Sequence, residues 1–368
     1  YGQTGSGKTY SILGPGGGVG AGVGRSTDVP TTSVAGRDDE TNSAGVIPRA
    51  VRELFQMLEH RKLNAKNTRG AGTKTTLRYE IRLQFLELYG EEVRDLLSTS
   101  PSPTGGLKVR DNGGATGSEP EVVGASEVTV TTADEALLCL ARGMMRRVTG
   151  ATAMNTESSR SHAIMTAVIE QTQTTLLDDD DGDEEDEETA YMRSKFHFVD
   201  LAGSERAKRT QAVGQRLAEG IMINQGLLVL GNVISALGDP KKVGKTHVPY
   251  RDSKLTRLLR GSLGGNHRTL MVACVSPSSS NMAESINTLR YSNRARNIQN
   301  RAVVNVDPTT KLVGELRGRV KDLAGELLRV RTVLSESSGN ALNGIGGTFT
   351  DDALRILASG GDAQTASS

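Results

Sequence analysis

The spacing of apolar residues predicts helices and strands in the first half of the chain. Residues 47–60 place apolar side chains three and four positions apart, as one face of a helix does, and residues 133–147 repeat this pattern. Residues 77–89 alternate apolar and polar side chains, which predicts a strand with one buried face. We expect residues 91–97 to continue as a short helix and residues 98–126 to form loop or a short hairpin.

The second half of the chain carries further elements of both kinds. Residues 162–173 and 194–201 have the pattern of strands, and helices are predicted over 215–238 and 281–299. The short, wholly apolar run at 269–276 is typical of a buried central strand.

After residue 300 the pattern changes to a short extended piece followed by one helix. Residues 301–309 form the extended piece, and residues 310–336 carry Leu or Val at alternating spacings of four and three. This spacing is a heptad seam that favours a coiled coil, although Gly314, Gly318 and Gly325 each cost about 1 kcal/mol relative to Ala in a helix. Residues 337–368 are rich in Gly, Ser, Ala and Asp, which is typical of a disordered tail.

Charge narrows the class of partner. The net charge of +1 conceals an acidic run at 178–188, and the rest of the chain has a clear excess of Lys and Arg. A basic body favours an anionic partner. The acidic run lies between two predicted strands, so we interpret it as a solvated loop, with a regulatory or partner-repelling element as the alternative. Residues 14–44 are rich in Gly, Ser, Thr and Asp and predict a long flexible insertion.

Cysteine and histidine usage points away from a structural metal site. The chain has two cysteines in apolar stretches and five histidines, and none of them shows the spacing of metal ligands. Two buried thiols suggest a reducing compartment. No apolar run reaches the length of a membrane span, so we expect an intracellular protein.

The first candidate site is a phosphate loop at the start of the chain. Residues 2–9 read G-Q-T-G-S-G-K-T and match every fixed position of the pattern G-x-x-x-x-G-K-[ST]. The glycines let backbone amides wrap a polyphosphate, Lys8 reaches the β and γ phosphates, and the Thr9 hydroxyl binds Mg²⁺. By itself the motif predicts binding of a nucleoside triphosphate and nothing narrower.

Two further motifs supply groups that suit phosphoryl transfer. Asp200 ends an apolar strand and begins D-L-A-G-S-E, where a carboxylate organises Mg²⁺ and Gly203 can offer its amide to the γ-phosphate. Residues 155–162 read N-T-E-S-S-R-S-H, with hydroxyls, an Arg and an Asn that suit Mg²⁺ and phosphate. Taken alone, each motif is also consistent with an ordinary turn or helix cap.

Together and in this order, the three motifs resemble the phosphate loop and the two switches of kinesins. Further stretches also resemble segments of the kinesin core: 45–55, 85–97, 247–259, 263–266 and 287–298. The resemblance implies an α/β fold, a P-loop NTPase of kinesin type with a central, mostly parallel β-sheet and helices on both faces. Within the family, the sequence around 218–239 is most similar to the chromokinesin-type class.

The resemblance also implies a division of the chain. Residues 1–300 would be the motor domain, 301–309 the neck linker with Asn305 at a latch-like position, and 310–336 a neck helix. Kinesins place strands before the phosphate loop, whereas this sequence opens on the loop itself. We therefore expect the first strands of the sheet to be missing from this stretch, and we expect the stretch alone to be unstable or inactive.

Roles for individual residues follow from the resemblance. The implied cofactors are ATP and Mg²⁺. The implied nucleotide contacts are Gly2, Gln3, Thr4, Gly5, Ser6, Gly7, Lys8, Thr9, Tyr10 and Asn155. The implied catalytic residues are Ser158, Ser159, Arg160, Asp200, Gly203 and Glu205. Thr9 and Ser159 would ligate Mg²⁺, Asp200 would hold it through water, and Arg160 would pair with Glu205 when the switches close. Tyr10 would present its ring to the adenine, with simple helix packing as the alternative.

The implied partner is the microtubule, whose tubulin is acidic, so the binding face should be basic. Candidate contacts are Arg206, Lys208, Arg209, Arg251, Lys254 and Arg257. An ordinary solvated basic surface is the alternative. Nothing in this stretch indicates a nucleic-acid partner.

The function that the resemblance implies is a microtubule-stimulated ATPase motor, with plus-end direction, in the cytoplasm on microtubules or the spindle. The neck helix would allow a homodimer. Two alternatives stay open: a nucleotide-gated microtubule-binding protein that does not step, and a truncated, inactive fragment.

Overall fold

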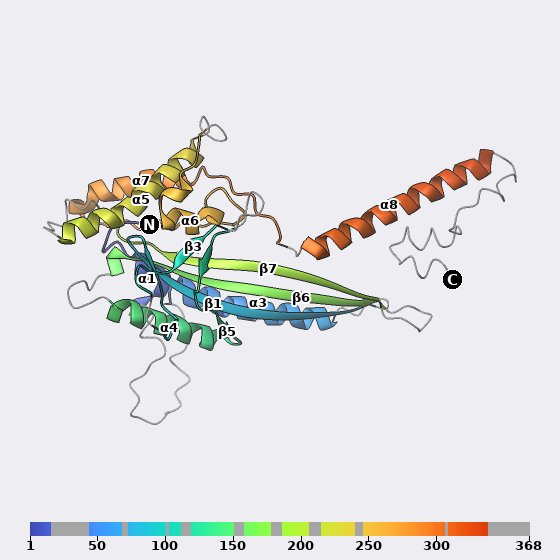
Figure 1. Cartoon of the computed structure of the whole chain (residues 1–368), viewed down its shortest axis with the longest axis horizontal. Coiled ribbons are helices and arrows are strands. Elements are labelled where there is room, and N and C mark those ends of the chain that lie inside the picture. Colours follow the sequence, from blue (N-terminus) through green and yellow to red (C-terminus); the bar gives the residue numbers. More distant parts are fainter. Residues whose placement is uncertain are drawn as a thin grey trace, which may run out of the picture.

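The structure is a computed structural model in which ten stretches of the chain are described (Figure 1). They are residues 1–15, 44–67, 73–100, 103–111, 119–150, 158–177, 186–205, 215–239, 246–305 and 308–337. Most of the predicted insertion at 14–44, most of the acidic run and nearly all of the predicted tail lie outside the described residues. Those predictions therefore stay predictions.

Three long strands form the centre of the main sheet (Figure 1): β1 (Thr73–Tyr89), β6 (His162–Leu177) and β7 (Asp186–Asp200). The order is β2-β1-β6-β7, with β2 (Glu92–Asp95) beside β1 and β5 (Val128–Val130) also paired to β1. Every described pair of strands is antiparallel. The expected mostly parallel sheet is therefore wrong for these strands, because β1–β2 and β6–β7 are hairpins that reverse the chain.

Tyr1 at the start of the chain makes backbone hydrogen bonds of the parallel type. The Tyr1 amino group donates to the Val272 carbonyl at 2.9 Å, and the Tyr1 carbonyl accepts from the Cys274 amide at 2.8 Å. Residues on either side of 273 thus bond to one residue, which is the parallel pattern. One residue of pairing does not make a ladder, and 269–276 form no strand in the structure. Leu270 is 87% exposed, so the predicted buried central strand is not observed.

The expected short helix at 91–97 is also wrong, because this stretch turns back as β2. Tyr89 pairs with Glu92, so Gly90 and Glu91 form a two-residue hairpin turn. Gly90 has φ +57°, the left-handed conformation that such turns require and that glycine adopts without steric cost. The predicted short hairpin within 98–126 is confirmed as β3 (Lys108–Arg110) with β4 (Glu121–Val123).

Helices cover both faces of the sheet, as expected (Figure 1). One face carries α1 (Lys8–Leu13), α3 (Val46–Asn67) and α4 (Ala133–Gly150). The other carries α5 (Gln215–Gly238), α6 (Lys254–Leu258) and α7 (Met282–Ala295). Short 3₁₀ turns join them: η2 (Ser158–Arg160), η4 (Tyr250–Asp252), η5 (Arg260–Ser262) and η6 (Ser279–Asn281).

The two cores follow from the alternation of β1. Ile81, Leu83 and Phe85 are buried under α3 and α4, whereas Leu86 and Leu88 face the second core, with residues of α5, α6 and α7. Successive side chains of a strand point to opposite faces, so one strand supplies both cores. The sheet is thereby fixed between two helical layers.

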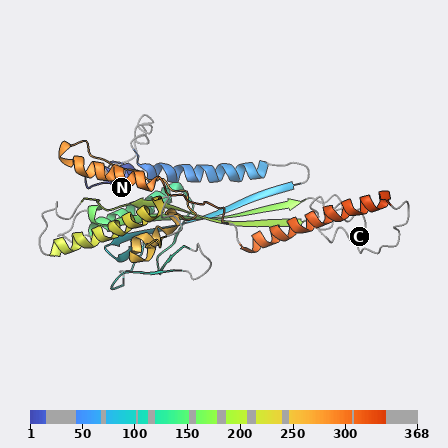
Figure 2. The same ribbon diagram turned by 90° about the horizontal axis from the view of Figure 1, so that it is seen from above.

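The last described segment leaves the body of the molecule. The amide of Arg193 on β7 donates to the Asn305 carbonyl at 3.1 Å, which fixes the end of 301–305 to the sheet edge. Beyond it, α8 (Pro308–Ser337) extends away from the body (Figure 2). The seam residues of α8 are 44–64% exposed: Leu316, Val320, Leu323, Leu327 and Val330. Among the described helices, none is both long and apolar enough to cross a membrane.

Candidate functional site

The loop at residues 2–7 winds tightly before α1 begins. Gly5 and Gly7 have φ +78° and +92°, conformations that other residues rarely adopt. At Gly2, an added Cβ would lie 2.2 Å from the Cys274 carbonyl oxygen, so only glycine fits beside that backbone. Lys8 is buried, and its ammonium donates to the Gln3 carbonyl at 2.8 Å. This hydrogen bond connects the two ends of the loop.

The three motifs meet at this loop through backbone and side-chain hydrogen bonds. The Gly203 amide donates to the Ser159 carbonyl at 2.7 Å, and the Ser204 amide donates to the Gly2 carbonyl at 3.1 Å. The Thr9 hydroxyl donates to Asp200 Oδ2 at 3.0 Å. Segments about 40 and 150 residues apart in the sequence thus form one site, as the motifs predicted.

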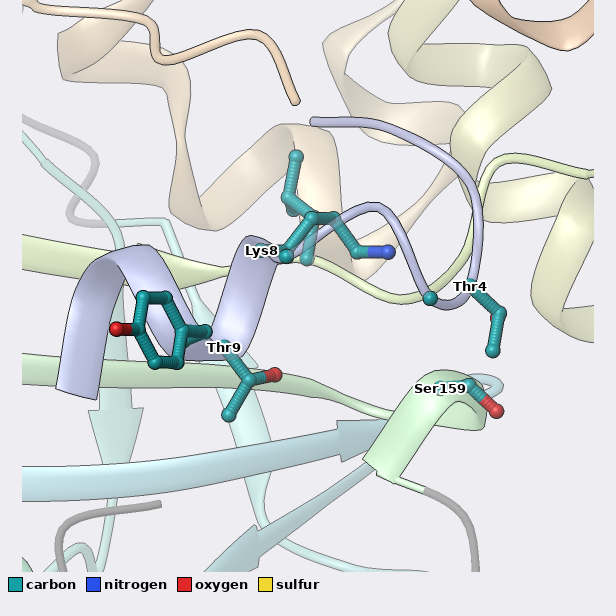
Figure 3. A pocket seen from close by; sticks show the side chains of 8 residues that line it. Thr4, Lys8, Thr9 and Ser159 are labelled. Atoms are coloured by element: carbon teal, nitrogen blue, oxygen red, sulfur yellow. The ribbon is translucent and has the colours of Figure 1, made fainter. Parts of the chain in front are cut away.

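A pocket opens where these segments meet (Figure 3). Lys8, Thr9 and Thr4 of the loop border it, and Ser159 of η2 lies across from them. The lining residues are Thr4, Gly5, Gly7, Lys8, Thr9, Tyr10, Ser159 and Leu201. Tyr10 is 60% exposed at the pocket, so its ring is accessible to a planar ligand, and core packing is not its role.

Glu205 holds the loop in a way that the sequence did not predict. Its carboxylate accepts from the Thr4 amide at 2.8 Å and from the Thr4 hydroxyl at 2.5 Å. A loop amide is therefore already paired with an anionic oxygen, the kind of partner that a phosphate would be. The predicted pair of Arg160 with Glu205 stays a prediction.

Arg147 is a site residue that the sequence analysis missed. This buried side chain donates to Asp200 Oδ2 at 2.9 Å and to the Ser161 carbonyl at 2.7 Å. It also lies 3.9 Å from Glu87. A signal was present, since Arg147 follows Leu140 and Met144 along the apolar face of the predicted helix at 133–147, where a charge needs a partner.

His162, the first residue of β6, links the motif at 155–162 to the motif that begins at Asp200. Its Nδ1 accepts from the Ala202 amide at 3.0 Å inside the core. Burial, with smaller contributions from the charges of Arg147 and Lys8, lowers the His162 pKa to about 3. The ring is therefore neutral at physiological pH, which keeps Nδ1 available as an acceptor.

The residues at the pocket fit Mg²⁺. Asp200 Oδ1 is buried and accepts no hydrogen bond from the described residues. The other oxygen of the same carboxylate, Oδ2, accepts from Thr9 and Arg147. A buried carboxylate oxygen without a donor suits a cation or its bound water. Carboxylate and hydroxyl oxygens are the ligands that Mg²⁺ prefers, and Thr9 and Ser159 present such hydroxyls here.

Several predicted residues lie outside the described part of the chain. They are Asn155, Arg206, Lys208 and Arg209. The remaining basic candidates lie on η4 and α6, where Arg251 and Arg257 approach Asp111 at 3.5 and 3.3 Å. Arg257 also donates to the Val109 carbonyl at 2.9 Å, so it contributes to structure as well as to charge. Lys254 opens α6, and its amide donates to Glu91.

Comparison with known families decides the assignment. The family model described as the kinesin motor domain matches residues 1–298. This chain belongs to the kinesin motor domain family. The match ends close to the predicted boundary at residue 300, just before the extended segment that follows α7.

Similar kinesins include both chromosome-associated and other members. The chain is 44% identical over 333 residues to the chromosome-associated kinesin KIF4A of Homo sapiens, covering 89% of this chain and 23% of that protein. It is 41% identical over 374 residues to the kinesin-like protein KIF21B of Mus musculus, covering 96% and 20%. The predicted similarity to chromokinesins is thus confirmed. The chain spans about a fifth to a quarter of the length of these two relatives.

Solved structures of kinesins share the fold. A KIF14 dimer in a two-heads-bound state with AMP-PNP, in complex with a microtubule, matches with a TM-score of 0.65 and 36% identity. The match covers 86% of this chain and 75% of that one. A structure described as that of a fast kinesin matches with a TM-score of 0.59 and 36% identity, covering 84% and 72%. The expected kinesin-type P-loop fold is confirmed.

Proposed function

We propose that this kinesin domain is a microtubule-stimulated ATPase motor. The observation that carries the proposal is the shared pocket, in which the phosphate loop, Ser159 and the strand end at Asp200 are joined by hydrogen bonds. The family relationship supports the same reading, and one of the similar structures is described as bound to a microtubule.

The polar groups at the pocket have defined roles in this proposal. Lys8 and the loop amides would bind the β and γ phosphates, and Thr9 and Ser159 would ligate Mg²⁺ with Asp200 nearby. Mg²⁺ supplies charge neutralisation on the phosphates when it is bound. Gly203 would report on the γ-phosphate by exchanging the partner of its amide, which donates to the Ser159 carbonyl in this structure.

Glu205 has two alternative partners in this proposal. It now accepts two hydrogen bonds from Thr4, at the loop that would receive phosphate. A bound polyphosphate would repel this carboxylate and release it toward Arg160 of the other switch. Closure of the switches would thus be tied to occupation of the loop.

The chemistry would rest on positioning and charge. Hydrolysis of a phosphoanhydride needs an oriented water and stabilised oxygens more than a strong base. Ser158, Ser159 and Arg160 are contributed by one short turn, so all three would be aligned by the same backbone contact to Gly203.

The linker supports motor activity, with plus-end direction as the finer proposal. Asn266 donates to Asn305 Oδ1 at 2.6 Å and also accepts from the Val303 amide. The Arg301 amide donates to the Gly265 carbonyl at 2.9 Å. These contacts hold 301–305 along the core, the arrangement that could transmit a change at the switches to whatever follows.

ATP turnover with and without taxol-stabilised microtubules tests the proposal. We expect stimulated turnover by this chain, and its loss in Lys8→Ala, with the half-exposed Lys62→Ala on α3, outside the pocket, as the matched control. Turnover without stimulation would leave an ATPase but remove the motor. Nucleotide-dependent microtubule binding without turnover would favour the non-stepping alternative. Absence of both activities would favour the inactive fragment, and the assay would be repeated with preceding strands added.

A further inference from the structure

Three side chains outside the nucleotide pocket converge from distant parts of the sequence. Glu119 precedes β4, His197 lies on β7, and His267 follows η5. One ligand atom from each lies within 4.8 Å of the other two. The sequence spacing gave no sign of this cluster, because its members are about 70 to 80 residues apart and only the fold brings them together.

Each imidazole ring has a hydroxyl group beside its Nδ1 atom. The Thr166 hydroxyl lies 2.8 Å from His197 Nδ1, and the Ser262 hydroxyl lies 3.0 Å from His267 Nδ1. In a metal-bound ring, Nδ1 would carry the proton and Nε2 would be free to act as the ligand atom. Each hydroxyl can then accept a hydrogen bond from Nδ1 and hold the ring in the ligating form.

The surrounding backbone positions the His267 ring further. The His267 amide donates to the Gly261 carbonyl at 3.0 Å, and its carbonyl accepts from Asn300 at 2.7 Å. An added Cβ on Gly261 would lie 2.4 Å from the ring, so the ring packs directly on that glycine. The site is thus built in advance on a turn that is held from two sides.

The carboxylate completes the set. Glu119 Oε1 is in contact with His267 Nε2, and Glu119 Oε2 accepts from Lys195 at 2.6 Å. The two rings lie 5.1 Å apart between centroids. An ion would replace the proton between Glu119 and His267, while Lys195 could keep its own oxygen.

We propose that Glu119, His197 and His267 form a binding site for a divalent transition metal, with Zn²⁺ as the preferred ion. Two imidazoles and one carboxylate suit Zn²⁺ and its neighbours, whereas Mg²⁺ and Ca²⁺ favour sites made of oxygen alone. Three protein ligands leave a fourth position for water. The Lys195 ammonium opposes the metal charge and weakens the site.

The site lies next to the segment that holds the linker. Asn266, whose side chain contacts both Val303 and Asn305, immediately precedes His267. A metal that joined His267 to β7 would fix the turn carrying Asn266. The proposed site is therefore a clamp on the base of the 301–305 segment, and it uses none of the nucleotide-pocket residues.

Titration of the untagged chain with Zn²⁺, followed by calorimetry, and with Co²⁺, followed by absorption, tests the proposal. Excess Mg²⁺ is kept present to occupy oxygen-only sites such as the acidic run. We expect one equivalent of metal, with a Co²⁺ spectrum of a four-coordinate site that lacks thiolate charge-transfer bands. Removal of a ligand in His197→Gln or His267→Gln should weaken binding by more than about 100-fold, since even outer partners contribute 10–100-fold.

His60→Gln on the exposed face of α3 is the matched control and should bind metal as the parent does. Two further variants should change the affinity for metal, whereas neither would do so if the cluster only stabilised the fold. Gly261→Ala should weaken binding by displacing the ring, and Lys195→Met should tighten it by about fivefold by removing a repelling charge. Circular dichroism checks that each variant folds. Absence of stoichiometric binding to the parent chain, or equal binding by the folded Gly261→Ala, Glu119→Gln and parent proteins, would overturn the proposal.

Discussion

At the residue scale, the polar groups of the nucleotide pocket depend on partners that come from other elements. Asp200 is held by Arg147 of α4 and by Thr9 of α1, and the Ala202 amide is held by His162. Glu205 is held by Thr4. The free energy lost when a contact is removed depends on how deeply the remaining partner is buried. We therefore expect a loss of stability at Arg147 and a change in nucleotide binding at Glu205.

We expect Arg147→Met to destabilise the domain by about 3–5 kcal/mol, because it would leave the buried Asp200 carboxylate without its cation. Urea unfolding followed by circular dichroism measures this loss. Arg142→Met, at an exposed position of the same helix, is the control and should change stability by less than about 0.5 kcal/mol. Equal midpoints for the two variants would show that the ion pair with Asp200 is unimportant.

Glu205→Ala should separate nucleotide binding from turnover. Without the competing carboxylate on Thr4, we expect nucleotide to bind about fivefold more tightly, since an exposed charged hydrogen bond contributes about 1 kcal/mol. Stimulated turnover should fall sharply, because the proposed partner of Arg160 is gone. Binding of a fluorescent nucleotide and steady-state turnover are the two readouts, with the exposed Glu53→Ala as control. Weaker nucleotide binding by Glu205→Ala would contradict the competition.

The burial of His162 predicts a loss of stability in acid. Its folded pKa of about 3 lies below the usual value near 6.5, so the unfolded chain binds a proton that the folded chain excludes. This contribution to stability is complete above about pH 6.5 and is lost as the pH falls toward 3. Between pH 7 and 5 the loss should be about 2 kcal/mol. Arg147 and Lys8, the charged groups that act on the ring, strengthen the effect.

Unfolding free energies of the parent and His162→Gln at pH 7 and pH 5 check this expectation. The variant should lose about 2 kcal/mol less than the parent over this interval, whatever its stability at pH 7. The exposed His60→Gln should behave as the parent does. A parent-like slope in His162→Gln would assign the acid sensitivity to other groups.

At the element scale, the patterns of length and alternation predicted which elements exist, and the turns decided how they join. The helix at 215–238 is observed with the predicted bounds, and the helices at 47–60 and 133–147 are confirmed but longer. The helix predicted at 91–97 was wrong, because so few residues fit both the helical and the strand spacing of apolar side chains. The left-handed Gly90 turn resolves the choice in favour of a hairpin.

The segment 301–305 provides the test at this scale. Asn266→Ala would remove a donor to Asn305 and an acceptor for Val303, so we expect the equilibrium constant for docking of residues 301–305 on the core to fall by about tenfold. A spectroscopic label on residue 304, whose side chain is exposed, reports the mobility of the segment. The exposed Asn64→Ala is the control, and an immobile label in Asn266→Ala would show that the backbone contacts suffice.

At the scale of the whole molecule, α8 projects from the body with an apolar seam that is exposed along the helix (Figure 1). Such a seam favours pairing with a second copy. Gly318 and Gly325 oppose helix formation. Among the described residues, nothing beyond the helix's own backbone lies within 4 Å of a Cβ added at either position.

We expect the double replacement of Gly318 and Gly325 by Ala to shift the chain toward a dimer. Each change should stabilise the helix by about 1 kcal/mol without a steric clash. Analytical ultracentrifugation over a range of concentrations measures the shift, and the further change Leu323→Ser on the seam should reverse it. A monomer at every concentration in the double variant would exclude α8 as a dimerisation element.

The family resemblance, the nucleotide motifs and most of the helices and strands could be predicted from the sequence alone. Motifs such as G-Q-T-G-S-G-K-T and D-L-A-G-S-E are read locally, because backbone geometry and phosphate chemistry require those residues at those positions. The same holds for the amphipathic helices, whose periods are properties of a single segment.

Only the tertiary structure decided which distant residues act together. The burial of Arg147 against Asp200, the contact of Glu205 with Thr4 and the antiparallel order of the strands depend on contacts between segments far apart in the chain. The cluster of Glu119, His197 and His267 has the same origin. Such contacts produce no periodic pattern in the sequence. Each of these residues interacts with a residue that is close in space but distant in the chain, so the local sequence does not reveal the partner.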